Sequence, residues 1–271
     1  MPQNYEIAIY AYYQALRTIA HYAGSDFTPV LRPGLPDTIK TLMSQAGELA
    51  QPLGPGGNSL DNYQPLQSIM GHLHSGDYPG YYLPQHIGSH TAMPTTQMPD
   101  PEDMRGTYQE IWAKIKATYD DLEIASQTTA AVQEASLYAL LQRYAWAIPA
   151  PVAGANDVSY FDYTRIRAAL AVCLNPENAD SESAAPGDVD PETPALLVGA
   201  DLSGVQDWLY TIASTGAAKS LRGRSVYLQL LMEVIALDLL DELKLPMANL
   251  LYVGGGNFYM VVPARCQEAI S

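Results

Sequence analysis

The residues best suited to hold a ligand lie in one short stretch where cations alternate with hydroxyls. Lys219 to Ser225 carries three cations and two hydroxyls just before an apolar run typical of a helix. A helix beginning at Ser225 would point free backbone N–H groups at a phosphate beside these cations, and Ser225 could cap it. Gly223 would let the backbone come close to the ligand. The pattern predicts that four residues bind a nucleotide: Lys219, Ser220, Arg222 and Arg224.

Two apolar segments on either side of this stretch predict the strands that must position it. Leu196 to Asp201 reads as a buried strand that ends in a Ser203-Gly204 turn. A second run, Leu250 to Val262, is interrupted by three consecutive glycines, which accept the positive φ of a hairpin. The apolar stripe of the helix between them, Ser225 to Leu243, is too broad for a surface helix and predicts packing against a sheet. Strand, helix and hairpin in this order form the core of a ferredoxin-like Palm domain.

In such a domain the end of the first strand and the hairpin face one crevice. Asp201 stands where Palm-type nucleotidyl transferases hold a metal-binding carboxylate, although it could equally form an Asx turn that caps the reversal. The cationic stretch could likewise be a solvated turn or a face that contacts another domain. The nucleotide hypothesis places five more residues in the crevice: Asp201, Ser203, Gly204, Gly255 and Gly256.

Three motifs in this region resemble those of a known family. They are Ala-Asp-Leu-Ser-Gly-Val-Gln-Asp-Trp at 200–208, Ala-Ala-Lys-Ser-Leu-Arg-Gly-Arg-Ser at 217–225 and Gly-Gly-Gly-Asn-Phe-Tyr at 254–259. They are similar to the first Palm domain of the large "Cas ten" subunit of type III CRISPR effector complexes, in its Csm-type branch. The resemblance implies ATP as a possible ligand, with Mg²⁺ held through a second Palm. It implies other effector subunits as partners, including a Cas-five-like or Csm-four-like subunit, with crRNA and target RNA contacted indirectly.

The family's catalytic residues are missing from the hairpin. In the family, catalysis belongs to a Gly-Gly-Asp-Asp sequence on the second Palm, whose paired carboxylates hold the Mg²⁺ ions. Here Asn257 and Phe258 follow the glycines, as in a non-catalytic first Palm. No second Palm is recognised in the 271 residues, and no catalytic residue is expected.

The upstream region resembles the family's HD nuclease domain, with its metal ligands replaced. Arg17-Thr18 align with the His-Asp pair of active members, and Asp162-Tyr163 align with the later Asp-His pair. Because imidazoles and carboxylates must converge to hold a water-activating metal, the HD-type site is expected to be lost. Four other histidines, His72, His74, His86 and His90, lie in the irregular insertion, where histidines are usually solvated polar residues, so we expect no metal site there either.

Composition fixes the class and the organisation of the chain. A net charge of −15 argues against non-specific nucleic-acid binding by the surface as a whole. Two separated cysteines, no signal-like N-terminus and no apolar span predict a cytoplasmic protein without membrane contact. The predicted fold class is α+β. Its parts are a mostly helical, degenerate HD-like domain at 1–174 with an irregular insertion at 51–106, an acidic Pro-rich linker at 175–195, and an incomplete Palm domain at 196–271.

Three functions fit these features. The first is a component or N-terminal portion of a type III CRISPR surveillance complex, with an inactive nuclease domain and a non-catalytic nucleotide-binding Palm. The second is one half of a cyclic-oligoadenylate synthase, which supplies an ATP site to a catalytic Palm outside this chain. The third is a free-standing nucleotide-binding regulator unrelated to CRISPR. Whether the chain is itself an enzyme is left open by the sequence.

We predict that the chain has no metal-dependent DNase activity, because Arg17-Thr18 and Asp162-Tyr163 replace the ligand pairs. Purified protein incubated with single-stranded DNA and Mn²⁺, Ni²⁺ or Co²⁺ should leave the DNA intact. Cleavage that persists through repurification and disappears in Asp162→Ala would refute the prediction.

Overall fold

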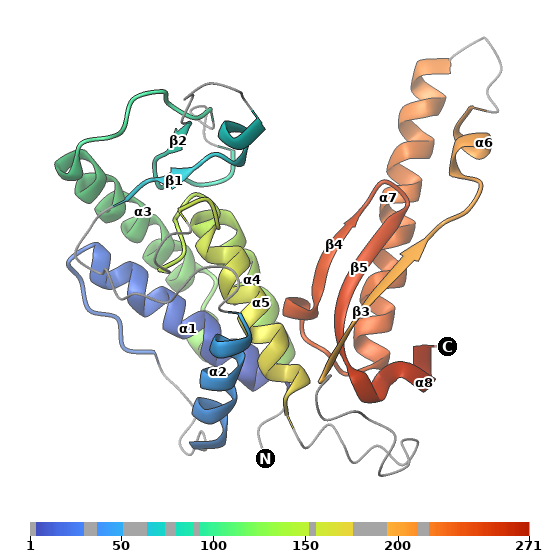
Figure 1. The fold of residues 1–271 in the computed structure, drawn as a ribbon, viewed down its shortest axis with the longest axis horizontal. Coiled ribbons are helices and arrows are strands. Elements are labelled where there is room, and N and C mark those ends of the chain that lie inside the picture. Colours follow the sequence, from blue (N-terminus) through green and yellow to red (C-terminus); the bar gives the residue numbers. More distant parts are fainter. Residues whose placement is uncertain are drawn as a thin grey trace. The chain divides into compact units, whose positions relative to one another are not determined.

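The computed structural model describes residues 4–29, 37–50, 64–73, 80–88, 93–151, 156–175, 194–210 and 217–270. The chain divides into two compact units, Met1–Ala171 and Val172–Ser271. The described part of the first unit is mostly helical, whereas the second combines a sheet with helices (Figure 1). The predicted α+β class is therefore confirmed.

The first unit is built on three helices that pack on one another: α1 (Asn4–Tyr22), α3 (Pro101–Asp121) and α4 (Ala130–Ala145). Helix α1 is buried on nearly every side, because its apolar residues and tyrosines occur all round the helix. Helix α4 starts at the cap provided by Thr129, whose hydroxyl accepts a hydrogen bond from the Val132 N–H. Helix α2 (Asp37–Leu49) packs on α1, and α5 (Tyr160–Cys173) follows α4 in the chain.

The region between α2 and α3 is only partly irregular. It contains two short strands that pair antiparallel, β1 (Leu66–Gln67) and β2 (Tyr81–Tyr82), and the 3-10 helix η2 (Ile69–Leu73). A second 3-10 helix, η3 (Ile124–Ser126), follows α3. The expected insertion at 51–106 extends too far, because α3 already begins at Pro101. Asp100 caps this helix by accepting the Glu102 N–H at 2.8 Å, and a proline fits the first helical position.

The second unit holds a three-stranded antiparallel sheet in the order β3-β5-β4 (Figure 1). The strands are β3 (Ala195–Asp201), β4 (Leu250–Gly254) and β5 (Asn257–Pro263). Their order, with a long helix between the first two, is the start of a ferredoxin-like arrangement. The predicted strand and hairpin are present, but β3 is not buried as expected: within the described structure none of its residues is buried, and Leu197 is 69% exposed. Shorter elements complete the described part: α6 (Val205–Tyr210), η5 (Met247–Asn249), η6 (Ala264–Cys266) and α8 (Gln267–Ile270).

Helix α7 (Ala217–Glu242) packs on β4 and β5, as its apolar content predicts. It buries one stripe at four-residue spacing, Leu228, Met232, Ala236 and Leu240. The neighbouring stripe is exposed within the described structure because one sheet covers only one side of a helix; it comprises Val226, Leu230, Val234 and Leu237. Among all the described residues, no helix is both long enough and apolar enough to cross a membrane.

A buried polar pair joins α1 to α4 in the core of the first unit. The carboxylate of Glu134, which is 1% exposed, accepts a hydrogen bond from the Tyr12 hydroxyl at 3.1 Å. Burial and the neighbouring Glu134 carboxylate raise the pKa of Tyr12, so this hydroxyl keeps its proton and remains a donor. Because a buried carboxylate without donors is costly, the pair fixes the register of the two helices.

We predict that Tyr12→Phe lowers the free energy of unfolding by about 1–3 kcal/mol, because it removes a donor from a buried carboxylate without changing the packed volume. Urea denaturation followed by circular dichroism measures this. Tyr138→Phe is the matched control, since the Tyr138 ring packs edge-on against Tyr12 at 6.4 Å and contributes to the core through its ring. Equal losses in both variants would contradict the role given to the Tyr12 donor.

Candidate nucleotide-binding site

The end of β3 and the tip of the β4–β5 hairpin form one cluster in the second unit. Asp201 lies opposite Asn257 in the register of β3 and β5. Directly after the strand, the Leu202 N–H donates to the Gly256 carbonyl at 2.8 Å. The structure thus brings together the predicted residues of the strand end and the hairpin: Asp201, Ser203, Gly204, Gly255 and Gly256.

Positive-φ glycines shape both turns of this cluster. Gly255 and Gly256 have φ of 63° and 94°, which suits a two-residue hairpin turn. Gly204 has φ of 78° at the end of the β3 turn, directly before α6 begins. A Cβ on Gly256 would come within 3.1 Å of the Val205 side chain, so the hairpin packs closely on the start of α6. The turns therefore need glycine for their backbone angles, and Gly256 also needs it for space.

The cationic residues occupy a different setting from the one predicted. The helix was expected to begin at Ser225 after a turn, but α7 already begins at Ala217. Ala, Lys, Leu and Arg are good helix formers, and an interior Gly223 costs only about 1 kcal/mol. Ser225 is therefore not a cap, and Gly223 is not a turn residue. Consequently Lys219, Ser220 and Arg222 are exposed side chains on the first turns of α7, with no helix start at Ser225 to support them.

Arg224 is held by α6. Its guanidinium lies 5.2 Å from the centre of the Trp208 ring and donates a hydrogen bond to the Trp208 carbonyl. The same ring contacts Tyr227 of α7 at 5.7 Å. This cation–π cluster joins α6 to α7 near the β3 turn, so Arg224 has a structural contact of its own. Trp208 and Val205 are the site residues that sequence reasoning did not assign, and no local spacing signals either contact.

The distance between the cations and the hairpin follows from the helix. Gln229 of α7 reaches the hairpin, since its side-chain oxygen would lie 3.7 Å from a Cβ on Gly254. Arg222 precedes Gln229 by about two turns, which is roughly 10 Å along the axis. Lys219 lies almost one further turn away. The structure therefore brings the strand end and the hairpin together, while the first turns of α7, which carry the exposed cations, extend beyond the hairpin (Figure 1).

The cluster does not suit a Palm-type pair of Mg²⁺ ions. Such a pair of ions needs two or more converging carboxylates. Asp201 instead lies opposite Asn257 in the strand register, and the residue after Asn257 is Phe258, which has no carboxylate. The side-chain oxygen of Asn257 is buried without a hydrogen-bond partner among the described residues. An orphaned acceptor beside the turn is suited to a ligand hydroxyl or amino group rather than to catalysis.

The four residues that the resemblance aligns with HD-type ligands lie on α1 and near the start of α5, and they do not build a metal site among the described residues. The Thr18 hydroxyl donates to the Gln14 carbonyl at 3.1 Å. Burial raises the pKa of Tyr160, and a hydrogen bond with Thr18 partly offsets this, so the start of α5 meets α1 here. Asp162 accepts from Ser159 Oγ at 2.9 Å and from Arg165 Nη2 at 2.7 Å. Its carboxylate is therefore engaged by hydrogen bonds at the start of α5. Tyr163 is half-buried and has no imidazole that could bind a metal.

Within the described residues no group of three or more histidines, cysteines or acidic residues could hold a metal ion. His74 and His90, and the side chain of His72, lie outside what the structure describes, as does 176–193 of the expected linker. His86 is half-buried and its ring contacts Tyr144 at 6.2 Å. Arg17, Thr18, Asp162 and Tyr163, which the resemblance aligns with HD-type ligands, form a set that does not fit such a metal.

The chain thus combines a mostly helical unit with a second unit built from an antiparallel sheet, a long helix and a glycine hairpin. Residues 194–270 match the family model described as Csm1 subunit domain B. The chain is 33% identical over 193 residues to the CRISPR system single-strand-specific deoxyribonuclease Cas10/Csm1 (subtype III-A) of Methanocaldococcus jannaschii. The alignment covers 61% of this chain and 23% of that relative. The resemblance inferred from the motifs is therefore confirmed, and the chain is related to Cas10/Csm1.

Two further comparisons agree. The protein of the same name from Mycobacterium tuberculosis is 33% identical over 223 residues, covering 78% of this chain and 27% of that relative. A crystal structure of a Csm1-Csm4 cassette in complex with one ATP has the same fold, with a TM-score of 0.63 at 16% identity. It covers 99% of this chain and 41% of the matched chain. The chain thus spans about a quarter of the length of these curated relatives.

We predict that two glycine substitutions move the stability of the second unit in opposite directions. Gly223→Ala should raise the free energy of unfolding by about 0.5–1 kcal/mol, because Gly223 is inside a helix with nothing within 4 Å of an added Cβ. Gly256→Ala should lower it by more than about 1 kcal/mol, because the left-handed angle and Val205 both oppose a side chain.

Chemical denaturation of the two variants beside the parent protein measures both changes. A loss of stability in Gly223→Ala would show that this position is a turn after all, as the sequence pattern first indicates.

Proposed function

We propose that this chain forms the non-catalytic, nucleotide-binding part of the large subunit of a type III-A CRISPR effector complex. In this role the second unit contributes one wall of an ATP site, and the first unit is a scaffold without nuclease chemistry. The relatedness to Cas10/Csm1 supports the setting. One structural neighbour is a Csm1-Csm4 cassette in complex with one ATP, which supports ATP as the ligand and a Csm4-like subunit as the partner.

One observation carries the proposal: the junction between the β3 turn and the glycine hairpin. The bond from the Leu202 N–H to the Gly256 carbonyl fixes the two turns beside each other. Bare glycine backbone at the hairpin tip lets a flat or charged ligand approach closely. Asp201 and Ser203 offer an acceptor and a hydroxyl at the edge of this surface, which suits the ribose of a nucleotide.

In this proposal the exposed cations of α7, Lys219 and Arg222, bind the phosphates of the nucleotide. Lys219 and Arg222 stand roughly 10 Å or more beyond the point where α7 meets the hairpin. A nucleoside triphosphate is long enough to lie between them, with its sugar at the hairpin and its phosphates toward α7. Arg222 is the better phosphate donor of the two, because a guanidinium can bind two oxygens at once. Arg224 stacks on Trp208 and so shapes the wall.

A second candidate function is one half of a cyclic-oligoadenylate synthase. The absence of paired carboxylates around Asp201 in the described cluster favours binding over catalysis by this chain, so the chemistry would need a Palm supplied from elsewhere. The two candidates share the same ATP site and differ in whether bound ATP reacts. A free-standing regulator outside CRISPR is disfavoured by the relatedness to Cas10/Csm1.

We predict that Arg222→Glu lowers ATP affinity of the assembled complex at least tenfold, because it replaces a charge-assisted phosphate contact with repulsion. Equilibrium binding of labelled ATP and size-exclusion chromatography report affinity and assembly separately. Lys244→Glu, an exposed reversal of the same charge just after the end of α7, is the control and should change neither.

Unchanged ATP affinity in Arg222→Glu would remove this residue from the site. If assembly also fails in that variant, the first turns of α7 are a protein interface instead.

A further inference from the structure

A rigid chain reversal at the end of α1 creates a pocket in the first unit. The Gly24 N–H donates to the His21 carbonyl at 2.9 Å, and the Ser25 N–H donates to the Ala20 carbonyl at 2.9 Å. With Gly24 at φ of 67°, this is the Schellman pattern of a helix end. It turns residues 25–29 back along the helix that they have just left.

Phe27 anchors the returning segment in the core. Its ring contacts Trp112 at 5.4 Å and Tyr119 at 5.5 Å, both on α3, and Tyr13 of α1 at 6.2 Å. A segment held by a hydrogen-bonded turn at one end and three aromatic contacts at its centre is a fixed wall. The space between this wall and α1 is therefore part of the fold.

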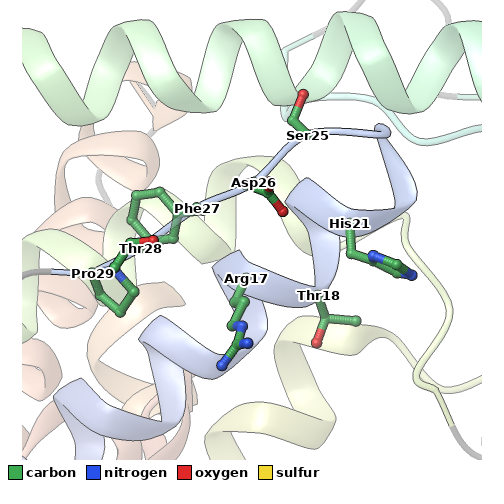
Figure 2. Close-up of a pocket in the computed structure, with 8 residues that line it drawn as sticks. All are labelled: Arg17, Thr18, His21, Ser25, Asp26, Phe27, Thr28 and Pro29. Carbon is green, nitrogen blue, oxygen red and sulfur yellow. The ribbon is translucent and has the colours of Figure 1, made fainter.

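The pocket has a volume of about 540 Å³ and is lined by Arg17, Thr18, His21 and residues 25–29. Figure 2 shows Arg17, Thr18 and His21 on α1 and Asp26 on the returning segment above them, with the Arg17 guanidinium pointing away from Asp26 in this view. Thr18 is committed to Gln14 and Tyr160. In contrast, the side chains of Arg17, His21 and Asp26 have no hydrogen bond or ion pair in the described part of the chain.

We propose that this pocket binds a phosphate group, with the Arg17 guanidinium as its main contact. Arginine stands at a position where the resemblance to nucleases implies a metal-ligating histidine, so the pocket carries a fixed positive charge of its own. A guanidinium presents paired N–H donors that match two oxygens of a phosphate. His21, one helical turn further along the same face of α1, supplies an imidazole N–H.

Asp26 makes the site selective for an oxyanion that carries a proton. A carboxylate can accept a hydrogen bond from the P–OH of a phosphate, but it only repels a fully ionised anion. A phosphate ester has its second pKa near about 6, so it retains this proton in part of the near-neutral range. Sulfate has no such proton, although its size and shape are almost the same. The pocket should therefore distinguish phosphate from sulfate.

The phosphate could belong to a small molecule or to the end of a single-stranded nucleic acid. This inference concerns the first unit and goes beyond the ATP site proposed on the second. Its failure would leave that proposal intact, because Arg17 and Arg222 are tested separately.

The test is isothermal titration of the full chain at about pH 6 with inorganic phosphate and with sulfate at equal ionic strength. Phosphate should bind saturably and sulfate at least tenfold more weakly. Arg17→Gln should weaken phosphate binding roughly tenfold or more, as expected for a lost charged contact. Arg105→Gln, which removes an exposed charge from α3 of the same unit, should leave it unchanged.

Asp26→Asn should bring phosphate and sulfate to similar affinities, which a merely cationic surface would not show. Two further ligands identify the source of the phosphate: adenosine monophosphate, and a short 5′-phosphorylated oligothymidylate compared with the same oligonucleotide bearing a 5′-hydroxyl. The ligand that binds more tightly indicates whether the phosphate belongs to a small molecule or to a nucleic-acid end. The proposal is overturned if phosphate does not saturate, if sulfate binds equally in the parent protein, or if a folded Arg17→Gln variant keeps full affinity.

Discussion

Left-handed glycine backbone is the constraint on which the second unit depends. Gly204, Gly255 and Gly256 adopt angles that other residues reach only at a cost, and they do so at two turns that touch. Because Gly256 rests on Val205 and accepts the Leu202 N–H, the hairpin and the start of α6 cannot move independently. The surface proposed to bind a nucleotide depends on that contact, and so does the position of Trp208 beside α7.

The carboxylates of the described residues do not gather with histidines or cysteines into a group that could hold a metal ion. Asp162 is engaged by Arg165 at the start of α5, and Asp201 faces an asparagine. Around the β3 turn and on the first turns of α7, the described structure offers glycine backbone, exposed cations and single acceptors, groups that can bind anions and sugars.

The sequence was most informative where local chemistry decides the structure. The hairpin is predictable because consecutive glycines between two apolar runs are typical of a tight turn between strands. The strand before Ser203-Gly204 is predictable because an apolar run that ends in turn residues is typical of a strand. The start of α7 could not be predicted in this way, because Gly223 suggests a turn. The helical propensity of the residues around Gly223 overrides that signal. Long-range contacts gave no signal: Arg224 stacks on a tryptophan from another helix, and Asp26 reaches the Arg17 pocket through a chain reversal.

The central claim is that nucleotide binds at the junction of the β3 turn and the glycine hairpin. Photo-cross-linking of the assembled complex with azido-ATP, followed by mass-spectrometric mapping of labelled peptides, tests it most directly. The account predicts labels within residues 201–210 and 250–260 of this chain, and their loss when excess unlabelled ATP is added. Labels confined to other parts of the chain, or a complex that binds ATP without labelling this chain, would contradict it.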